Sequence, residues 1–416
     1  MQDLFIRTGE LLIPAPDVDP TAWACVACDQ YTSQPEYWHE VEALVGDRPS
    51  TLRLVLPEIY LDQAAQRIPA IHQAMLDALA QGWLVPGVRD GFILTERSTG
   101  SGDRLGLVVL LDLEGYDYRP GSRTPVRATE GTIEDRIPPR LAVRRGAALE
   151  LSHVLLLADD PHQTVLEPLL ARSDTLPLLY DFPLMQGGGH VRGYAVQGAD
   201  AVAVLAALRA LWERHPGGML LAVGDGNHSL ATAKAAWEER KAHLTQAEQA
   251  DDPARYAMVE IVNIHDDALT FEPIHRVLFH VDGDALLTDW RAHAQGADYS
   301  LVCDAAGQPV ELVYGGKAVP LSICGSGAPL AVGALQTFLD TWLPAHPDAR
   351  LDYVHGADTA RALAQQPDTA AFLLPVFPKG QLFPAVEALG VLPRKTFSMG
   401  EAHEKRYYLE ARRLQR

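Results

Sequence analysis

The feature that most constrains this chain is an apolar run that passes directly into a short polar loop and then into an alanine-rich segment. Residues 219–223 are apolar and predict a buried strand, and residues 224–229 supply glycine, aspartate, asparagine, histidine and serine. A helix is predicted from about Leu230 into the 240s. The segment therefore predicts a strand and a helix joined by a loop of chemically versatile side chains.

This loop contains residues suited to binding an anion. Gly224 and Gly226 let the backbone approach a ligand closely and adopt positive φ. The free N–H groups and the dipole at the start of a helix favour an anion, especially phosphate. His228 could donate to that phosphate or shuttle a proton, and Asp225 could hold a metal or act as a base.

The same spacing also fits an ordinary helix start. Asn227 or Ser229 could cap the helix above a glycine turn, and that arrangement requires no ligand. The anion-binding alternative instead assigns both side chains to a phosphate.

Composition narrows the class of protein. The chain has 416 residues, of which 47% are hydrophobic and 21% charged, which is typical of a globular protein with two or three domains. This balance excludes a disordered chain, a collagen-like repeat and a coiled-coil rod. A net charge of −19 opposes non-specific binding, so neither nucleic acid nor a membrane surface is expected as a partner. The apolar runs are too short to span a bilayer, and the first residues do not resemble a signal peptide.

Cysteine usage favours a reducing compartment. Four cysteines do not make a disulfide framework, so we expect a cytoplasmic protein. Cys25 and Cys28 form a C-x-x-C pair, but Cys303 and Cys324 are too widely spaced to complete a zinc knuckle.

Strand and helix signals interleave along the whole chain. Helices are predicted over residues 64–79, 202–211, 335–343 and, as a charged terminal helix, 394–416. Strands are predicted over residues 52–57, 92–95, 105–111 and 256–264, and short strands with glycine turns over 283–331. The alternation is too irregular for a doubly wound sheet and predicts an α+β (mixed α/β) fold. We expect two lobes, residues 1–195 and residues 196–416, the second of which carries the loop at 224–233.

A second polar concentration lies at residues 127–136. Arg127 and Arg136 could clamp a phosphate or carboxylate bidentately, and Glu130 could act as a base, with the Thr132 hydroxyl nearby. The alternative is a solvated loop with local ion pairs.

Two further segments could contribute to an anion site. His275 and Arg276 follow a proline at the mouth of a predicted strand and could face an anion, although an exposed pair of this kind often has no role. Lys395 and Thr396 lie in a locally basic tail and could reach a phosphate. The alternative for that tail is a solvated terminal helix.

Several of these strings together resemble the family catalogued as domain of unknown function 1015. The resemblance spans nearly the whole length, beginning with A-C-D-Q-Y-T-S-Q-P-E-Y-W near the start. The matching segments, in order, are residues 27–38, 127–136, 224–233, 273–276, 353–356 and 395–396.

The central loop of this family is similar to the D-G-H-H-R loop of the ParB/sulfiredoxin-like superfamily, which binds nucleotide phosphates. That superfamily includes free-serine kinases, nucleotide-dependent sulfiredoxins and CTP-binding partition proteins. Here the loop reads D-G-N-H-S, so Ser229 replaces the arginine, and residues 129–132 read T-E-G-T where H-E-x-T is usual. The phosphate charge would then be met by other cations, namely Arg127, Arg136, Arg276 or Lys395.

The leading hypothesis is an enzyme that transfers a phosphoryl group to or from a small hydroxyl metabolite, with serine and phosphoserine implied by the resemblance. Such transfer needs positioning and charge neutralisation more than covalent chemistry. Asp225 or Glu130 would act as base or hold Mg²⁺, and His228 and His275 would donate protons or hydrogen bonds. The groups expected to hold the phosphate of ATP or ADP are Gly224, Gly226, Asn227, Ser229, Arg127, Thr132, Arg136, Arg276, Lys395 and Thr396.

Two alternatives come from other classes of protein. One is a non-catalytic module that senses a nucleotide or phosphometabolite and acts on another protein. The other is a metal-dependent hydrolase that uses His228, Asp225 and His275. Phosphoryl transfer with the full residue set requires the four polar segments to fold around one pocket.

Overall fold

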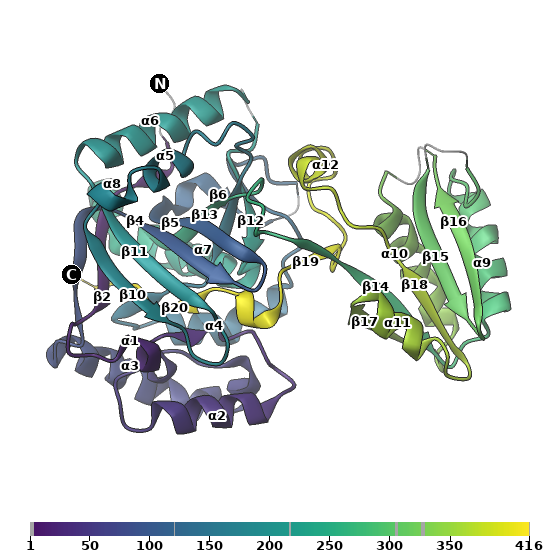
Figure 1. Ribbon diagram of the computed structural model, residues 1–416, viewed down its shortest axis with the longest axis horizontal. Coiled ribbons are helices and arrows are strands. Elements are labelled where there is room, and N and C mark those ends of the chain that lie inside the picture. Colours follow the sequence, from purple (N-terminus) through teal and green to yellow (C-terminus); the bar gives the residue numbers. More distant parts are fainter. Residues whose placement is uncertain (1–3, 120, 216–217, 304–306, 326–328, 416) are drawn as a thin grey trace. The chain divides into compact units, whose positions relative to one another are not determined.

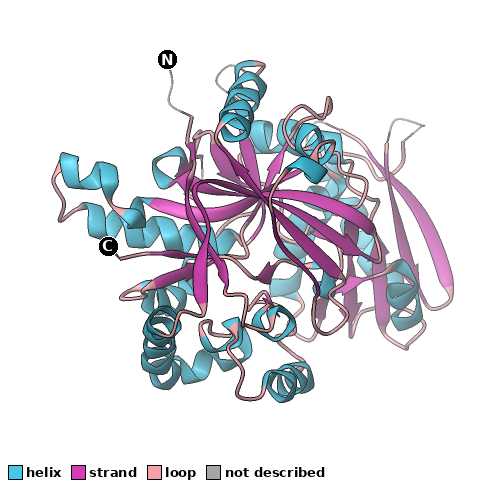
Figure 2. Cartoon of the chain, turned by 60° about the vertical axis from the view of Figure 1, so that its left-hand side comes forward, coloured by secondary structure: helices cyan, strands magenta, loops and turns pink. Residues whose placement is uncertain are grey.

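Helices and strands alternate throughout the chain (Figures 1 and 2), so the predicted mixed α/β class is confirmed. The structure is a computed structural model that describes residues 4–119, 121–215, 218–303, 307–325 and 329–415. No described helix is both long enough and apolar enough to cross a membrane.

The chain divides into two compact units, each built from separate stretches of sequence. The first comprises Met1–Thr270, Phe383–Val391 and Gly400–Arg416, and the second comprises Phe271–Leu382 and Leu392–Met399. The boundary predicted between residues 195 and 196 falls inside strand β11 (His190–Gln197), which pairs along its whole length with β4 (Leu84–Thr99). The chain therefore continues within the first unit at that point.

A mixed sheet forms the centre of the first unit. Among the described residues it contains 13 strands, in the order β6-β7-β12-β9-β13-β5-β4-β2-β21-β8, with β1 paired to β5 and the β10–β11 hairpin paired to β4. The remaining bounds are β1 (Ile6–Arg7), β2 (Gly9–Pro14), β5 (Gly102–Asp112), β6 (Tyr116–Asp117), β7 (Val126–Ala128), β8 (Leu149–Leu151), β9 (Leu155–Ala158), β10 (Leu178–Pro183), β12 (Leu221–Asp225), β13 (Tyr256–Asn263) and β21 (Ala411–Arg413). Two short strands, β3 (Cys25–Val26) and β20 (Tyr407–Tyr408), pair separately.

Both faces of this sheet are covered, because alternate residues of its central strands enter two different cores. Ile93 of β4 belongs to one apolar cluster, whereas its neighbours Phe92 and Leu94 belong to another. Successive side chains of a strand point to opposite faces, so a strand buried on both sides is apolar throughout. The predicted hairpin is confirmed, since β4 pairs antiparallel with β5 up to the turn between Thr99 and Gly102.

The predicted helices over 64–79 and 202–211 and the strand over 256–264 are confirmed as α3, α6 and β13. The strand predicted over 52–57 is wrong. Thr51–Arg53 forms a 3-10 turn, in which Ser50 accepts from the Leu52 N–H and Thr51 donates to the Trp23 carbonyl. Such local side-chain bonds compete with a strand ladder.

The helices of the first unit are α1 (Pro20–Trp23), α2 (Pro35–Val45), α3 (Ala64–Ala80), α4 (Ile137–Arg144), α5 (Glu167–Leu170), α6 (Ala199–Glu213), α7 (Asn227–Lys241) and α8 (Gln246–Asp251). Helix α12 (Leu382–Leu389) follows later in the sequence.

The second unit is built on a six-stranded sheet of order β16-β15-β18-β14-β17, with β19 on β14. The predicted helix over 335–343 is confirmed as α10, but residues 283–296 form helix α9 rather than short strands. Leu286, Leu287, Trp290 and Ala294 lie three or four residues apart and are buried on one face of α9. The bounds are β14 (Phe271–Phe279), α9 (Gly283–Gly296), β15 (Gln308–Tyr314), β16 (Lys317–Ile323), α10 (Ala331–Trp342), β17 (Arg350–His355), α11 (Ala357–Leu363), β18 (Thr369–Leu373) and β19 (Phe397–Met399).

A disulfide joins Cys303 and Cys324, a cross-link that the cysteine count did not predict. The β15–β16 hairpin returns the chain on itself, and Ser300 bridges to Cys324 just beyond it. Two cysteines distant in sequence are thereby brought together.

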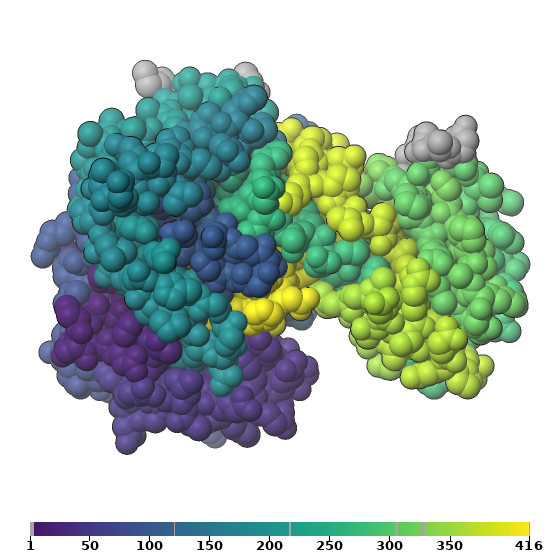
Figure 3. Space-filling view, viewed as in Figure 1, coloured from purple at the N-terminus to yellow at the C-terminus, as the bar shows by residue number. Residues whose placement is uncertain are grey.

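The charged helix predicted over 394–416 is wrong, because this segment is extended and largely buried. It forms β19, β20 and β21, and Figure 3 shows the last residues (yellow) lying against the N-terminal part of the first unit (purple). Arg406 and Arg412 of this segment are buried and paired rather than solvated. Arg406 donates to Glu260 at 2.5 Å and to Glu410 at 2.6 Å, and Arg412 pairs with Glu150.

Replacing Arg406 with methionine should destabilise the first unit by about 3–5 kcal/mol, because Glu260 and Glu410 would lose a buried guanidinium partner. Urea unfolding followed by tryptophan fluorescence measures this change. Arg413→Met is the matched control, since that side chain is half exposed and lies 3.8 Å from Glu10. Equal unfolding midpoints for the two variants would contradict a stabilising role for the buried ion pairs of Arg406.

Candidate functional site

The predicted junction of a strand and a helix is present in the first unit, but the connection is shorter than the predicted loop over 224–229 and the helix begins before Leu230. Strand β12 ends at Asp225, Gly226 adopts the left-handed conformation with φ +78°, and α7 begins at Asn227. A Cβ atom at Gly226 would lie 3.0 Å from the Val154 Cα, so glycine is required both by conformation and by space.

The N-cap of α7 is Gly226 itself, with no side-chain hydrogen bond to the first turn. The alternative in which Asn227 or Ser229 caps this helix is therefore wrong. The Asn227 Oδ1 atom is buried and has no hydrogen-bond partner among the described residues. An uncapped start to a 15-residue helix leaves backbone donors and the positive end of the helix dipole for another acceptor.

A lysine far away in the sequence supplies positive charge to this junction. The Lys405 ammonium lies 3.4 Å from the Asp225 carboxylate, which also accepts from the Gly226 N–H at 2.9 Å. Arg97 holds this part of the tail by donating to the carbonyls of His403 and Lys405. The charge of Asp225 is thus balanced one residue before the helix begins.

A buried histidine connects the junction to the N-terminal part of the chain. His153 Nε2 lies 3.3 Å from the Ser229 hydroxyl and 3.6 Å from the Asp29 carboxylate, and its Nδ1 lies 2.8 Å from the Tyr408 hydroxyl. The Tyr408 hydroxyl also contacts the Cys28 thiol at 3.0 Å. One chain of polar contacts therefore links four separate segments of sequence.

The pKa of Asp29 lies below its usual value, although burial alone would raise it. The interaction with His153, a hydrogen bond from Gln30 and the charge of Lys405 together outweigh burial. Asp29 is therefore ionised at neutral pH. Burial instead raises the pKa of the Cys28 thiol to about 12, so this cysteine is a neutral thiol rather than a thiolate nucleophile.

The segment 127–136 reaches the same junction because β7 runs parallel to β12. Ala128 pairs with Val223, so the two strands end at the same edge of the sheet, and the Thr129 hydroxyl donates to the Val223 carbonyl at 2.7 Å. Beyond this point the Ile133 N–H donates to His228 Nε2 at 3.3 Å. Two polar segments that the sequence separates by nearly a hundred residues are thus in contact.

Within this segment the residues have different environments. The Arg127 side chain is buried, and its Nε donates to the Thr124 carbonyl at 2.9 Å. Glu130 is half-buried, and Arg136 is exposed at the start of α4. The Thr132 hydroxyl oxygen is buried and has no hydrogen-bond partner among the described residues, as is also true of the Asn227 amide oxygen.

His228 is uncharged at neutral pH. Burial and the charges of Arg140 and Arg136 lower its pKa to about 4. Because Nε2 accepts from the Ile133 N–H, the ring proton resides on Nδ1. His228 can therefore donate one hydrogen bond to a ligand.

The remaining predicted residues belong to the second unit and form a cluster of their own. Arg276 is fully buried and donates to the backbone carbonyls of Ile274, Lys395 and Arg394. The Thr396 hydroxyl donates to the Pro393 carbonyl, and His275 accepts from the Leu374 N–H at 3.2 Å. These contacts hold residues 392–399 against β14. That these side chains share a site with the 224–229 loop stays a prediction.

Sequence reasoning missed Asp29, His153, Lys405 and Tyr408. Asp29 lies in the N-terminal string that carries the family resemblance, so its position in that string was the available signal. Lys405 and Tyr408 lie in the tail that had been predicted as a solvated helix. The described residues hold no group of three or more His, Cys, Asp or Glu side chains arranged to bind a metal ion.

The depressed pKa of His228 predicts a pH dependence of stability. The folded chain favours the neutral ring, so this contribution is present above pH 6.5 and is lost as the pH falls toward 4. Between pH 7 and pH 5 the wild type should lose about 1 kcal/mol more than His228→Gln, since solvent screens this partly exposed ring. Urea unfolding at both pH values measures this, with the exposed His162→Gln as control. Parallel losses in wild type and His228→Gln would refute it.

Eight chains of solved structures match this chain, and three of them illustrate the similarity at low identity. A free serine kinase variant in complex with ADP is 12% identical, with a TM-score of 0.40, over 74% of this chain and 92% of that chain. SbnI with a C-terminal truncation from Staphylococcus aureus is 9% identical, with a TM-score of 0.37, over 70% and 82%. A conserved hypothetical protein from Pyrococcus furiosus is 12% identical, with a TM-score of 0.34, over 74% and 95%.

No curated protein matches this chain. A family model described as "Protein of unknown function (DUF1015)" matches residues 12–362, which is most of the sequence. The chain belongs to the DUF1015 family.

Proposed function

We propose that this protein binds a nucleotide or phosphometabolite at the start of α7 and transfers a phosphoryl group to or from a small hydroxyl metabolite such as serine or phosphoserine. The observation that carries the proposal is the uncapped N-terminus of α7, which follows a left-handed glycine and has the Lys405 ammonium 3.4 Å from the preceding Asp225. Helix starts of this kind bind phosphate because their N–H groups and dipole face the anion.

The charges around the junction support an anionic ligand. Lys405 contacts Asp225, and the charges of Arg140 and Arg136 add to burial in lowering the pKa of His228. Phosphoryl transfer spreads negative charge over the phosphate oxygens, and cations placed beforehand stabilise that charge without reorganisation. The Nδ1 proton of His228 and the hydroxyls of Ser229 and Thr132 would complete the cradle.

Proton transfer in this proposal uses the carboxylates of the junction. Asp225 and Glu130 are the proposed bases and the proposed carboxylates for Mg²⁺, which proteins commonly hold by one or two carboxylates with substrate phosphate oxygens. Asp29 is ionised and lies beside His153, so it would orient that ring toward Ser229 and the bound substrate.

One observation favours the sensing alternative. Asp225, the carboxylate nearest to the helix start, contacts the Lys405 ammonium, so this carboxylate already has a cationic partner in the absence of a substrate. A module that binds a nucleotide without turnover would retain the same cradle.

Replacing Lys405 with methionine should weaken binding of ADP by about 10- to 100-fold, the loss typical of one charge-assisted contact. Isothermal titration calorimetry with ADP, ATP and inorganic phosphate measures it. Lys317→Met is the control, because Lys317 is an exposed lysine of the second unit. Absence of binding to the wild type by all three ligands would overturn the phosphate site.

His228→Gln and Asp225→Asn should each lower turnover by about 10²- to 10³-fold if they stabilise the transferred group or move its proton. Phosphorus NMR can follow transfer between ATP or ADP and serine or phosphoserine, with Mg²⁺ and with a chelator. His162→Gln should leave the rate unchanged. Tight nucleotide binding by a wild type that turns over no pair would reject the enzyme and support the sensor.

A further inference from the structure

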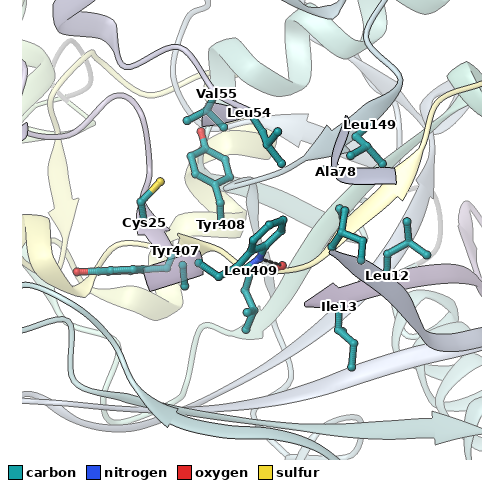
Figure 4. Close-up of a cluster of buried hydrophobic side chains, with 14 of the residues drawn as sticks. Leu12, Ile13, Cys25, Leu54, Val55, Ala78, Leu149, Tyr407, Tyr408 and Leu409 are labelled. Carbon is teal, nitrogen blue, oxygen red and sulfur yellow. Dashed lines mark hydrogen bonds between the residues drawn. The ribbon is translucent and has the colours of Figure 1, made fainter. Parts of the chain in front are cut away.

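A separate cavity lies in the first unit beside the first turns of α7. Its volume is about 130 Å³, and most of its wall is hydrocarbon. Figure 4 shows Leu54 and Val55 near the Tyr408 ring. The apolar wall also includes Met75, Val143, Ala147 and Leu149. Ser229 and Cys28 also line it, so the cavity adjoins the polar chain described above.

The cavity has a charged end with one guanidinium group in excess. Arg140 pairs with Glu58, and Arg144 lies 2.5 Å from Glu150, all four lining the wall. Glu150 also pairs with Arg412, so three guanidinium groups meet two carboxylates there.

One nitrogen of these guanidinium groups lacks a hydrogen-bond partner within the described part of the chain. Arg144 Nη2 is buried and has no hydrogen-bond partner among the described residues. Asp252 also acts on Arg412, but it pairs with a further guanidinium, that of Arg240, at 2.8 Å, so counting both leaves the same excess of one positive charge. A buried donor without an acceptor is costly, and an anionic acceptor would satisfy both the hydrogen bond and the charge.

We propose that this cavity binds a small apolar monocarboxylate, an aromatic or branched aliphatic acid about the size of benzoate. A dry cavity of about 150 Å³ holds benzene, so the volume fits one ring or a short branched chain. One excess guanidinium suits a single negative charge, whereas a doubly charged phosphate would be left undercompensated in an apolar chamber. The carboxylate would accept from Arg144 Nη2, and the hydrocarbon would contact the leucine and methionine wall.

The experiment uses the full chain with benzoate, 4-methylpentanoate and the uncharged analogue benzyl alcohol, measured by calorimetry and by saturation-transfer NMR. Benzoate and 4-methylpentanoate should both bind saturably. Arg144→Met should lower the affinity for benzoate by about 10-fold or more and change the affinity for benzyl alcohol by less than about 2-fold. Arg145→Met is the matched control, because its neighbouring guanidinium pairs with Glu239 on the surface and should have no effect. Ala147→Leu, which fills the cavity, should lower the affinities for benzoate and for benzyl alcohol alike.

Absence of saturable binding by both acids at about 10 mM would overturn the proposal, as would equal effects of Arg144→Met and Arg145→Met. If Arg144→Met does not fold, a crystal of the wild type soaked in 4-bromobenzoate decides the matter. The anomalous bromine peak should lie between Leu54 and Met75, and a peak elsewhere refutes the site. The proposal does not rest on phosphoryl transfer, since loss of ADP binding with retained benzoate binding rejects only the phosphate site.

Discussion

The buried ion pairs of the C-terminal tail are the interaction on which the first unit depends. Arg406 bridges Glu260 of β13 and Glu410, and Arg412 joins β21 to Glu150 of β8. Each of these charges is nearly excluded from solvent, and a buried ion is tolerated only when its partner and hydrogen bonds are in place. The tail therefore occupies one register, with β21 between β2 and β8.

This register determines what the candidate site contains. Arg97 fixes the carbonyls of residues 403 and 405, which places the Lys405 ammonium beside Asp225. Three residues later Tyr408 reaches His153. The parallel pairing of β7 with β12 brings the segment 127–136 to the site, because two parallel strands end at the same edge of a sheet. Ile133 thereby contacts His228. The charge and polarity of the site follow from strand order rather than from any single motif.

The sequence predicted best those elements whose signals are local. The helix at 64–79, the hairpin around residues 98–103 and the strand leading to Asp225 follow from periodicity, turn residues and an apolar run. The junction of strand and helix was located for the same reason, because glycine conformation and helix starts are encoded within a few residues. The predicted loop was too long, since Gly224 and Asp225 end β12 and Asn227 already begins α7.

The failures have a common physical cause. The tail carries arginines at a density typical of a solvated helix, and only the distant acidic partners Glu260 and Glu150 make their burial favourable. The cross-link at Cys303 likewise depends on a hairpin between the two cysteines. Asp29 and His153 carry no periodic signal and meet only through the fold. Long-range pairing of charges is the information that a local pattern lacks.

The discontinuity of the first unit has a consequence for synthesis on the ribosome. Domains generally fold as units in the order in which they emerge. Here Phe271–Leu382 of the second unit emerges before Tyr407–Tyr408 and Ala411–Arg413 of the first. Until those last strands emerge, Glu150 and Glu260 have no guanidinium from the tail, and the gap between β2 and β8 is an open strand edge. The nascent first unit can therefore complete its sheet only after residues 407–413 have emerged, and the edges of β2 and β8 stay unpaired until then.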